Sequence, residues 1–254
     1  TSIMSRSRME QVKKKINVIH LLKVVKGRYT YNELSQLTGL PITVLARYVN
    51  GNVLPSDERA DELYRILAEK IPLEEIILSK LVLDESGYFD SSRVIWDVNL
   101  LRLISHKAVI PFMGRKIDKV MTAAVDGIPL ASFVAEELDA DLVIAKRYKE
   151  VGVKDFLEAT YVIGSSAVVS SLYIPKSALK KDDNVLIVDD AIRTGETDVA
   201  LIRLVEKAKA NIVGIFILIA TGKDWREKLQ KRTNAPIYVL TEINPKPLEV
   251  EQRK

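Results

Sequence analysis

The sequence of 254 residues contains no cysteine, which excludes disulfide bonds and zinc sites built on thiolates. It contains only two histidines, His20 and His106, so we expect no metal site made by the protein's own side chains. No apolar run is long enough to cross a membrane, and the N-terminus lacks the apolar segment of a signal peptide. We therefore expect a cytoplasmic protein that has no membrane partner.

Basic residues exceed acidic residues only in the first quarter of the chain. Residues 1–70 contain twelve basic and seven acidic residues, a net charge of +5, whereas the remainder contains 26 and 27, a net charge of −1. This asymmetry indicates an acidic partner for the N-terminal part, and nucleic acid is the first candidate. The alternative is a basic helix face that is only solvated, so charge alone does not decide the function.

The most informative stretch runs from residue 184 to 197 and reads Asn-Val-Leu-Ile-Val-Asp-Asp-Ala-Ile-Arg-Thr-Gly-Glu-Thr. The apolar run Val185–Val188 predicts a buried parallel strand that ends at Asp189 and Asp190. Residues 193–197 predict a turn that opens a helix. A helix N-terminus presents unpaired N–H groups and a partial positive charge, so this turn favours a phosphate.

The side chains of this stretch suit a sugar phosphate. Gly195 lets the backbone approach an anion closely, and the hydroxyls of Thr194 and Thr197 add hydrogen-bond donors. Asp189 and Asp190 can accept hydrogen bonds from neighbouring sugar hydroxyls or face a bound Mg²⁺. The alternative is a strand, a turn and a helix that bind no ligand.

The stretch resembles the phosphoribosyl pyrophosphate (PRPP) motif of the type I phosphoribosyltransferases, which is an apolar strand, two acids, two apolar residues and a Thr-Gly loop. The resemblance implies that the acids hold the ribose hydroxyls and that the loop holds the 5′-phosphate. Arg193 departs from the pattern, in which a small residue is usual. The implied residues for binding PRPP or a nucleotide are Asp189, Asp190, Ala191, Arg193, Thr194, Gly195, Glu196 and Thr197.

A second candidate anion loop lies one strand–helix–strand unit upstream. Residues 119–125 predict the first core strand and residues 141–145 the second, and in the resembled family the loop after the first strand binds pyrophosphate. Asp126 departs from the pattern, because a carboxylate repels pyrophosphate unless Mg²⁺ or a lysine intervenes. A plain turn is the alternative. The candidate pyrophosphate-binding residues are Val125, Asp126, Gly127 and Lys146.

The remaining pattern completes one sheet. Further strands are predicted at residues 211–219 and 235–240, and the segment 148–175 predicts a hairpin over the ligand crevice. Because predicted strands and helices alternate, we expect an α/β fold over residues 71–254: a doubly wound, mainly parallel five-stranded sheet of the type I phosphoribosyltransferase kind.

The first seventy residues predict a separate all-α domain. Residues 8–26 form an amphipathic helix whose apolar stripe begins with Val12 and Ile16, while the lysines at 13–15 lie mostly off the stripe. Two short helices then meet at Gly39, and a third helix follows the cap at residues 55–57.

This arrangement resembles the helix-turn-helix of phage repressors, in which the start of the second helix reads base edges in the major groove. The resemblance implies base contacts by Ile42, Thr43 and Arg47, and phosphate contacts by Tyr48 and Asn50. The alternative is a small helical bundle that binds protein or assists dimerisation.

The combination resembles the purine-operon repressors of bacteria and the orotate-phosphoribosyltransferase-like regulators of archaea. It implies a transcription regulator of nucleotide or purine metabolism that is a homodimer, binds double-stranded DNA, and senses PRPP or a nucleotide with Mg²⁺. The alternative is an active phosphoribosyltransferase that joins a nucleobase to PRPP, although we assign no catalytic residue.

Overall fold

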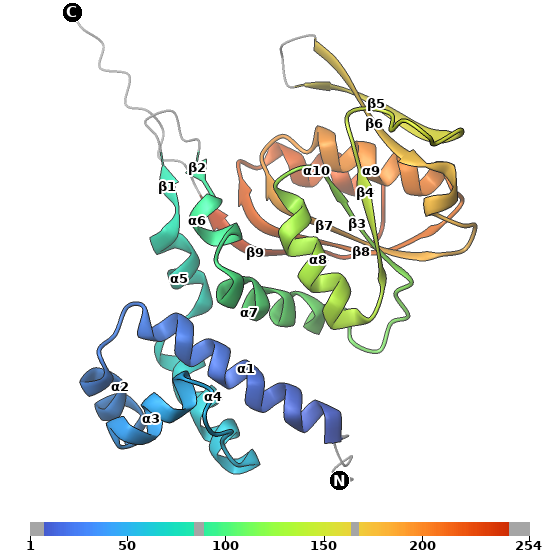
Figure 1. Ribbon diagram of the computed structural model, residues 1–254. Coiled ribbons are helices and arrows are strands. Elements are labelled where there is room, and N and C mark those ends of the chain that lie inside the picture. The colour runs from blue at the N-terminus through green and yellow to red at the C-terminus, as the bar shows by residue number, and fades with distance from the viewer. Residues whose placement is uncertain (1–7, 84–88, 164–167, 244–254) are drawn as a thin grey trace, which may run out of the picture. The chain divides into compact units, whose positions relative to one another are not determined.

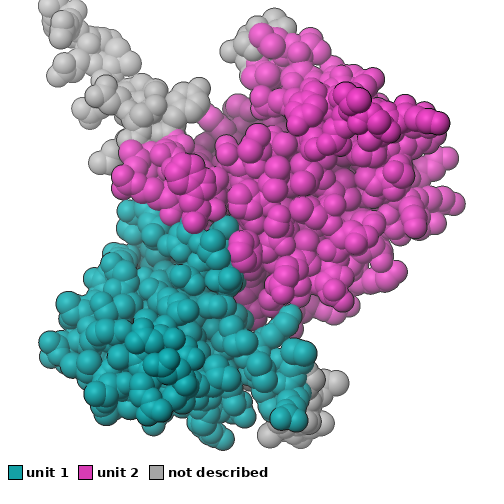
Figure 2. Space-filling view, viewed as in Figure 1, with its two compact units in different colours: residues 1–80, 97–103 teal, residues 81–96, 104–254 magenta. Residues whose placement is uncertain are grey.

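The computed structural model describes residues 8–83, 89–163 and 168–243. The chain divides into two compact units, residues 1–80 with 97–103 and residues 81–96 with 104–254 (Figure 2). Residues 71–80 therefore fall in the first unit, although the sequence assigned them to the second domain. None of the helices in the described ranges is both long and apolar enough to cross a membrane.

The first unit is helical, as predicted. Its second helix begins with a capping box, because the Thr30 hydroxyl accepts from the Glu33 amide while the Glu33 carboxylate accepts from the Thr30 amide at 2.7 Å. That helix ends at Gly39, whose φ of 71° is the left-handed conformation that glycine adopts most easily. The helices are α1 (Arg8–Lys26), α2 (Tyr31–Thr38), α3 (Ile42–Val49), α4 (Asp57–Lys70) and α5 (Leu73–Lys80).

The apolar stripe predicted for α1 is wrong at its N-terminal end. Val12 and Ile16 are exposed, whereas Val18, Leu22 and Val25 are fully buried. The reason is that the N-terminal half of α1 contacts α4 through charged side chains. Lys14 pairs with Asp61, and Lys15 Nζ lies 3.1 Å from Asp57 Oδ1. Two of the three clustered lysines thus hold the helices of this unit together.

The second unit is the predicted α/β fold (Figure 1). A short hairpin and two helices open it, and α7 contributes its first turns to the other unit. Its elements are β1 (Val82–Leu83), β2 (Phe89–Asp90), α6 (Ser92–Ile95), α7 (Val98–Val109), η1 (Ile110–Phe112), β3 (Lys119–Ala123), α8 (Gly127–Leu138), β4 (Asp141–Ala145), β5 (Phe156–Ile163), β6 (Val168–Pro175), η2 (Lys176–Ala178), β7 (Asn184–Ile192), α9 (Glu196–Lys207), β8 (Asn211–Thr221), α10 (Asp224–Gln230) and β9 (Ile237–Ile243).

Among the described residues, five strands form one sheet in the order β4-β3-β7-β8-β9, and every neighbouring pair is parallel. The central strand β7 continues past its predicted end at Asp189 and Asp190, because its pairing with β8 extends as far as Ile192 opposite Ala220. The two acids therefore lie inside the strand rather than at its end.

The two faces of the sheet pack against different elements. Val185 and Ile187 of β7 share one apolar cluster with Leu201 of α9. On the opposite face, a Cβ at Gly214 would overlap the ring of Phe112, so β8 must carry a glycine where that ring packs. Helices consequently cover both faces, as a doubly wound fold requires.

The predicted hairpin is confirmed as the antiparallel pair β5–β6, and the residues between the two strands, 164–167, lie outside the described residues. The base of the hairpin packs on α9, since Ala159 and Leu172 are buried in the α9 cluster. Backbone hydrogen bonds between Lys146 and Tyr173 join it to the end of β4.

Candidate functional site

The acid pair lies near the carboxyl end of the central strand, where open α/β sheets bind their ligands. The side chains of Asp189 and Asp190 are 6% and 8% exposed. Adjacent residues of a strand point to opposite faces of the sheet. The Asp190 amide donates to Asp189 Oδ1 at 3.0 Å, and the Ser91 hydroxyl reaches Asp190 Oδ2 at 3.5 Å.

Burial and repulsion between neighbouring carboxylates disfavour the charged forms of Asp189 and Asp190. Burial, followed by the charges of Asp198 and Asp190, raises the pKa of Asp189 well above its usual value. Burial and the nearby Asp126 raise the pKa of Asp190 to about 6. Such groups gain most from a ligand that brings hydroxyl donors or positive charge.

Asp198 is a member of this cluster that sequence reasoning missed. It is 2% exposed in the first turn of α9, and burial raises its pKa to about 7. Its Oδ1 atom has no hydrogen-bond partner among the residues that the structure describes. One signal was present in the sequence: Asp198 precedes the buried Leu201 and Ile202 by three and four residues, so it belongs to the inward stripe of the helix.

The predicted phosphate loop adopts a conformation that only its glycine favours. Gly195 has a φ of 80° and caps α9, which begins at Glu196, so Thr197 lies in the helix rather than in the turn. Arg193 and Thr194 are exposed, while Ala191 is half-buried. The exposed residues Arg193 and Thr194 therefore directly precede the N-terminus of α9, where a helix favours an anion.

Helix α10 braces this loop from outside the motif. A Cβ at Gly195 would lie 3.1 Å from atoms of both Trp225 and Leu229. Between them on the helix, Lys228 Nζ donates to the Thr194 carbonyl at 2.9 Å and to Glu196 Oε1 at 2.6 Å. The loop is thus held by contacts with residues some thirty positions further along the chain.

The second predicted loop lies beside the acid pair. Val125 and Asp126 are exposed, and α8 begins at Gly127. A Cβ at Gly127 would lie 2.8 Å from Asp189 Oδ1. The fold therefore brings together two motifs that are more than sixty residues apart in the sequence.

Lys146 follows β4, as predicted, but its ammonium group is engaged. It pairs with the carboxylate of Glu150, and this hydrogen bond raises the pKa of Lys146. An incoming pyrophosphate would have to draw Lys146 away from Glu150 or share it.

The helices of the first unit present the predicted DNA-contacting residues to solvent. On α3, Ile42, Thr43 and Arg47 are exposed, whereas Leu45 between them is completely buried. Tyr48 is half-buried, and Asn50 is the exposed residue that ends the helix. One face of α3 therefore packs in the core of its unit, and the other face is exposed.

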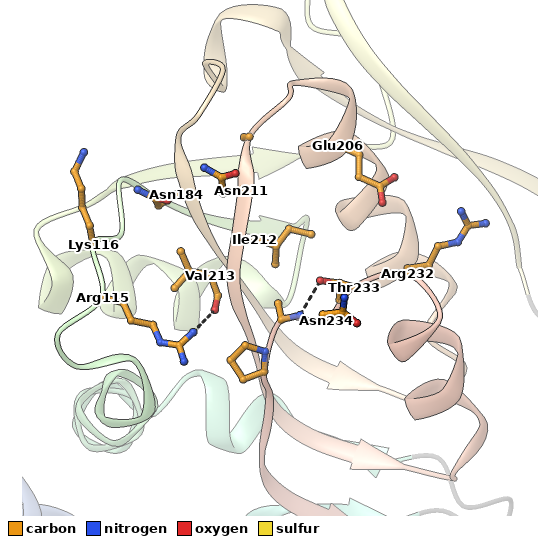
Figure 3. Close-up of a pocket in the computed structure, with 13 residues that line it drawn as sticks. Arg115, Lys116, Asn184, Glu206, Asn211, Ile212, Val213, Arg232, Thr233 and Asn234 are labelled. Carbon is orange, nitrogen blue, oxygen red and sulfur yellow. Dashed lines mark hydrogen bonds between the residues drawn. The ribbon is translucent and has the colours of Figure 1, made fainter.

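A hollow of about 830 Å³ lies at the opposite edge of the sheet from the acids (Figure 3). Asn184 and Asn211, the first residues of β7 and β8, line it, together with Pro236 ahead of β9. Arg115 donates there to the Val213 carbonyl at 3.0 Å, and Lys116 pairs with Asp118. The cationic side chains of Arg115 and Lys116 are thus engaged in contacts with other parts of the protein.

Within the described ranges, no group of three or more histidine, aspartate or glutamate side chains is arranged to hold a metal ion. The oxygen donors nearest to that role are the carboxylates of Asp126 and Asp190, which lie close enough for the charge of one to act on the pKa of the other. Oxygen donors of this kind suit a hard cation such as Mg²⁺ when the ligand supplies the remaining contacts.

Comparisons with known proteins agree with this geometry. The phosphoribosyl transferase domain family matches residues 98–250. The purine biosynthesis transcriptional repressor PurR of Bacillus subtilis is 32% identical over 168 residues, which cover 66% of this chain and 57% of the repressor. The xanthine phosphoribosyltransferase of Clostridioides difficile is 32% identical over 160 residues, which cover 62% of this chain and 83% of that enzyme.

Solved structures give the same result for the fold. The adenine phosphoribosyltransferase from Rhodothermus marinus aligns with a TM-score of 0.60 at 26% identity, and the alignment covers 67% of this chain and 98% of that chain. The match to the Bacillus subtilis repressor spans less than two thirds of that repressor's length.

Proposed function

Because the chain belongs to the phosphoribosyl transferase domain family, we propose that it is a DNA-binding regulator of transcription whose second unit binds PRPP or a nucleotide. Relatives named as purine biosynthesis repressors or activators favour genes of purine or nucleotide metabolism as its targets. Residues 1–70 bind the DNA, and the ligand site lies within residues 71–254.

The observation that carries this proposal is the exposed face of α3. Ile42, Thr43 and Arg47 are exposed on a helix whose Leu45 packs in the core, so the fold of the unit does not account for them. An arginine fork can read guanine, a threonine hydroxyl can pair with several bases, and isoleucine can contact a thymine methyl group. Tyr48 and Asn50 then contact phosphates, and a homodimer presents two such helices to a two-fold operator.

The second unit offers complementary groups for PRPP. The carboxylates of Asp189 and Asp190 accept hydrogen bonds from the ribose hydroxyls, and the loop 193–197 receives the 5′-phosphate at the N-terminus of α9. Loop 125–127 lies next to Asp189 and receives the pyrophosphate, with Lys146 as its cation.

Mg²⁺ binds together with the ligand and is not a metal that the protein holds by itself. It neutralises the charge of the pyrophosphate, which would otherwise be repelled by the exposed carboxylate of Asp126. Asp126 and Asp190 are the side chains of this crevice that can face the hydrated ion.

Regulation requires that the ligand bind the DNA-competent and DNA-incompetent states with different affinities, since a ligand with equal affinity for both shifts nothing.

A second function is favoured by the similarity to xanthine and adenine phosphoribosyltransferases, namely transfer of the phosphoribosyl group to a nucleobase. Release of pyrophosphate from PRPP on addition of single purine bases tests it directly.

The main experiment titrates the protein onto its own promoter DNA by fluorescence anisotropy at fixed salt, with and without PRPP and Mg²⁺. Salt is fixed because phosphate contacts make DNA affinity steeply dependent on it. Specific binding that shifts with PRPP supports the regulator and gives its sign. Specific binding that responds only to nucleotides changes the ligand, and absence of specific binding overturns the regulator.

A further inference from the structure

The loop proposed to bind the 5′-phosphate contains an acidic residue of its own. Glu196 is the first residue of α9, where the helix favours an anion, and its carboxylate is mostly buried with 21% of the side chain exposed. Burial acts to raise the pKa of Glu196, but hydrogen bonds from Lys228, Thr194 and its own amide lower it overall. The residue is therefore charged at neutral pH, in the place where the loop can attract a phosphate.

Lys228 holds that carboxylate from a different helix. Its Nζ atom donates to Glu196 Oε1 at 2.6 Å and to the Thr194 carbonyl at 2.9 Å, so one ammonium group bridges two residues of the loop. Trp225 and Leu229 on either side of it pack against Gly195. The helix that carries the cation is thus packed against the loop, and the cation has the Thr194 carbonyl as a second partner besides Glu196.

The carboxylate is only half satisfied. Glu196 Oε2 is buried and has no hydrogen-bond partner within the described part of the chain, which is unfavourable for a charged oxygen. A phosphate at the loop offers Lys228 a stronger partner, because it carries more charge and three acceptor oxygens. Charge repulsion between the phosphate and Glu196 would at the same time favour rotation of the carboxylate towards solvent.

We propose that Glu196 is an internal competitor for the phosphate site, and that Lys228 is the cation for which the carboxylate and the phosphate compete. Without ligand, Lys228 binds Glu196; with ligand, Lys228 binds the phosphate and Glu196 is displaced. This inference rests on the proposed function, because it takes the loop 193–197 as the 5′-phosphate site. It adds Lys228 to the binding residues and reverses the role of Glu196.

The test measures binding of ribose 5-phosphate to the full chain by calorimetry. Glu196→Gln keeps the size of the side chain and removes its charge, so affinity should rise roughly tenfold. Lys228→Met should lower affinity roughly tenfold, and Lys228→Arg should restore part of it. The double variant E196Q/K228M should lose the gain of E196Q, because the phosphate then lacks its cation.

The chain offers a matched control pair on the same helix. Lys231 Nζ lies 2.6 Å from Glu227 Oε1, and both side chains are more than two thirds exposed. Glu227→Gln and Lys231→Met change the same charges on α10 and should leave the affinity for ribose 5-phosphate unchanged. Mg²⁺-pyrophosphate is the control ligand, since it should bind the other loop equally well in E196Q and in the wild type.

Equal affinities in wild type and E196Q, or weaker binding in E196Q, would overturn the competition, because they would make Glu196 neutral or helpful to the phosphate. If PRPP still shifts DNA binding in that case, the regulator survives and only this inference fails. If no variant binds ribose 5-phosphate at millimolar concentration, the inference and the phosphate assignment both fail, while DNA binding in the absence of ligand is judged separately.

Discussion

Gly127 lies so close to the Asp189 carboxylate that any larger residue at position 127 would overlap it. A Cβ built on Gly127 would lie 2.8 Å from Oδ1 of Asp189 and would also overlap the side chain of Thr122. The start of α8 can therefore approach the central strand only through a glycine. This close approach places the loop before α8 beside Asp189, one of the two acids that precede the loop at Gly195 along the chain.

Replacement of Gly127 by alanine should therefore weaken ligand binding and also lower the stability of the second unit, because the added methyl group overlaps the buried side chain of Thr122. The methyl group also displaces the Asp189 carboxylate, and we expect the affinity for Mg²⁺-PRPP to fall by roughly tenfold or more. Calorimetric titration measures the affinity, and thermal unfolding measures the stability. Gly27→Ala, in the first unit, is the control and should not change PRPP binding; unchanged PRPP affinity in G127A would contradict the assigned site.

Local patterns predicted the elements of this fold well, because apolar periodicity and turn residues act within a few positions. The run Val185–Val188 and the turn at Gly195 lie in the strand and at the helix start where they were expected. The end of β7 was wrong because it depends on pairing with β8, where Ile192 meets Ala220. Nothing local to either strand encodes that register.

The site itself was only partly predictable for the same reason. The motif includes Glu196 but says nothing of Lys228, which reaches the loop from a helix 32 residues away in the sequence. The lysines of α1 contribute to the basic excess of residues 1–70, yet Lys14 and Lys15 pair with acids of α4. Charge counted along the sequence does not reveal which charges are already compensated in the fold.

The buried Asp198 predicts an unusual dependence of stability on pH. Burial raises its pKa to about 7 in the folded protein, above its ordinary value of 3.8. Between these values the folded state binds more protons than the unfolded state, so the free energy of unfolding should fall as the pH rises from about 4 to about 7. Asp198→Asn should be more stable than the wild type at pH 8, by up to a few kcal/mol, and should show a shallower decline.

Urea denaturation at a series of pH values measures this effect. The exposed Asp155 is the control, since Asp155→Asn should follow the wild-type profile. A D198N profile parallel to that of the wild type would show that Asp198 is not the group whose protonation stabilises the fold. Asp189 and Asp190 keep some decline in the variant, because burial raises the pKa of both.

Substitutions in the two units should have reciprocal effects on the two ligands. Arg47→Ala should weaken specific DNA binding by about 1–3 kcal/mol and leave PRPP binding intact, because an arginine that reads a base loses a bidentate contact. Arg47→Lys separates base reading from phosphate contact, since lysine keeps the charge but not the fork. The double change of Asp189 and Asp190 to asparagine should abolish PRPP binding and spare DNA binding without ligand.

Anisotropy with operator and scrambled DNA measures the first effect, and calorimetry with PRPP measures the second. An R47A protein with unchanged operator affinity would place the recognition surface elsewhere. Loss of both activities in either protein would indicate general unfolding, which thermal denaturation checks.

Leu45→Ala tests whether the exposed face of α3 depends on the buried face. Leu45 is completely buried, so its truncation should lower the stability of the first unit by about 2–5 kcal/mol. Specific DNA affinity should fall although Arg47 is unchanged, because a frayed α3 no longer presents its exposed side chains together. PRPP binding should persist, since the cluster around α9 does not include this residue.

The control for this last prediction is Leu54→Ala in the same unit. Leu54 is 50% exposed, so the same truncation should change stability little and leave operator binding as it is. Differential scanning calorimetry with and without PRPP should show that L45A lowers one transition while the ligand still raises the other. A single transition that L45A lowers and PRPP raises would instead mean that the two units unfold as one cooperative body, which would give the ligand a direct route to the stability of the DNA-binding helices.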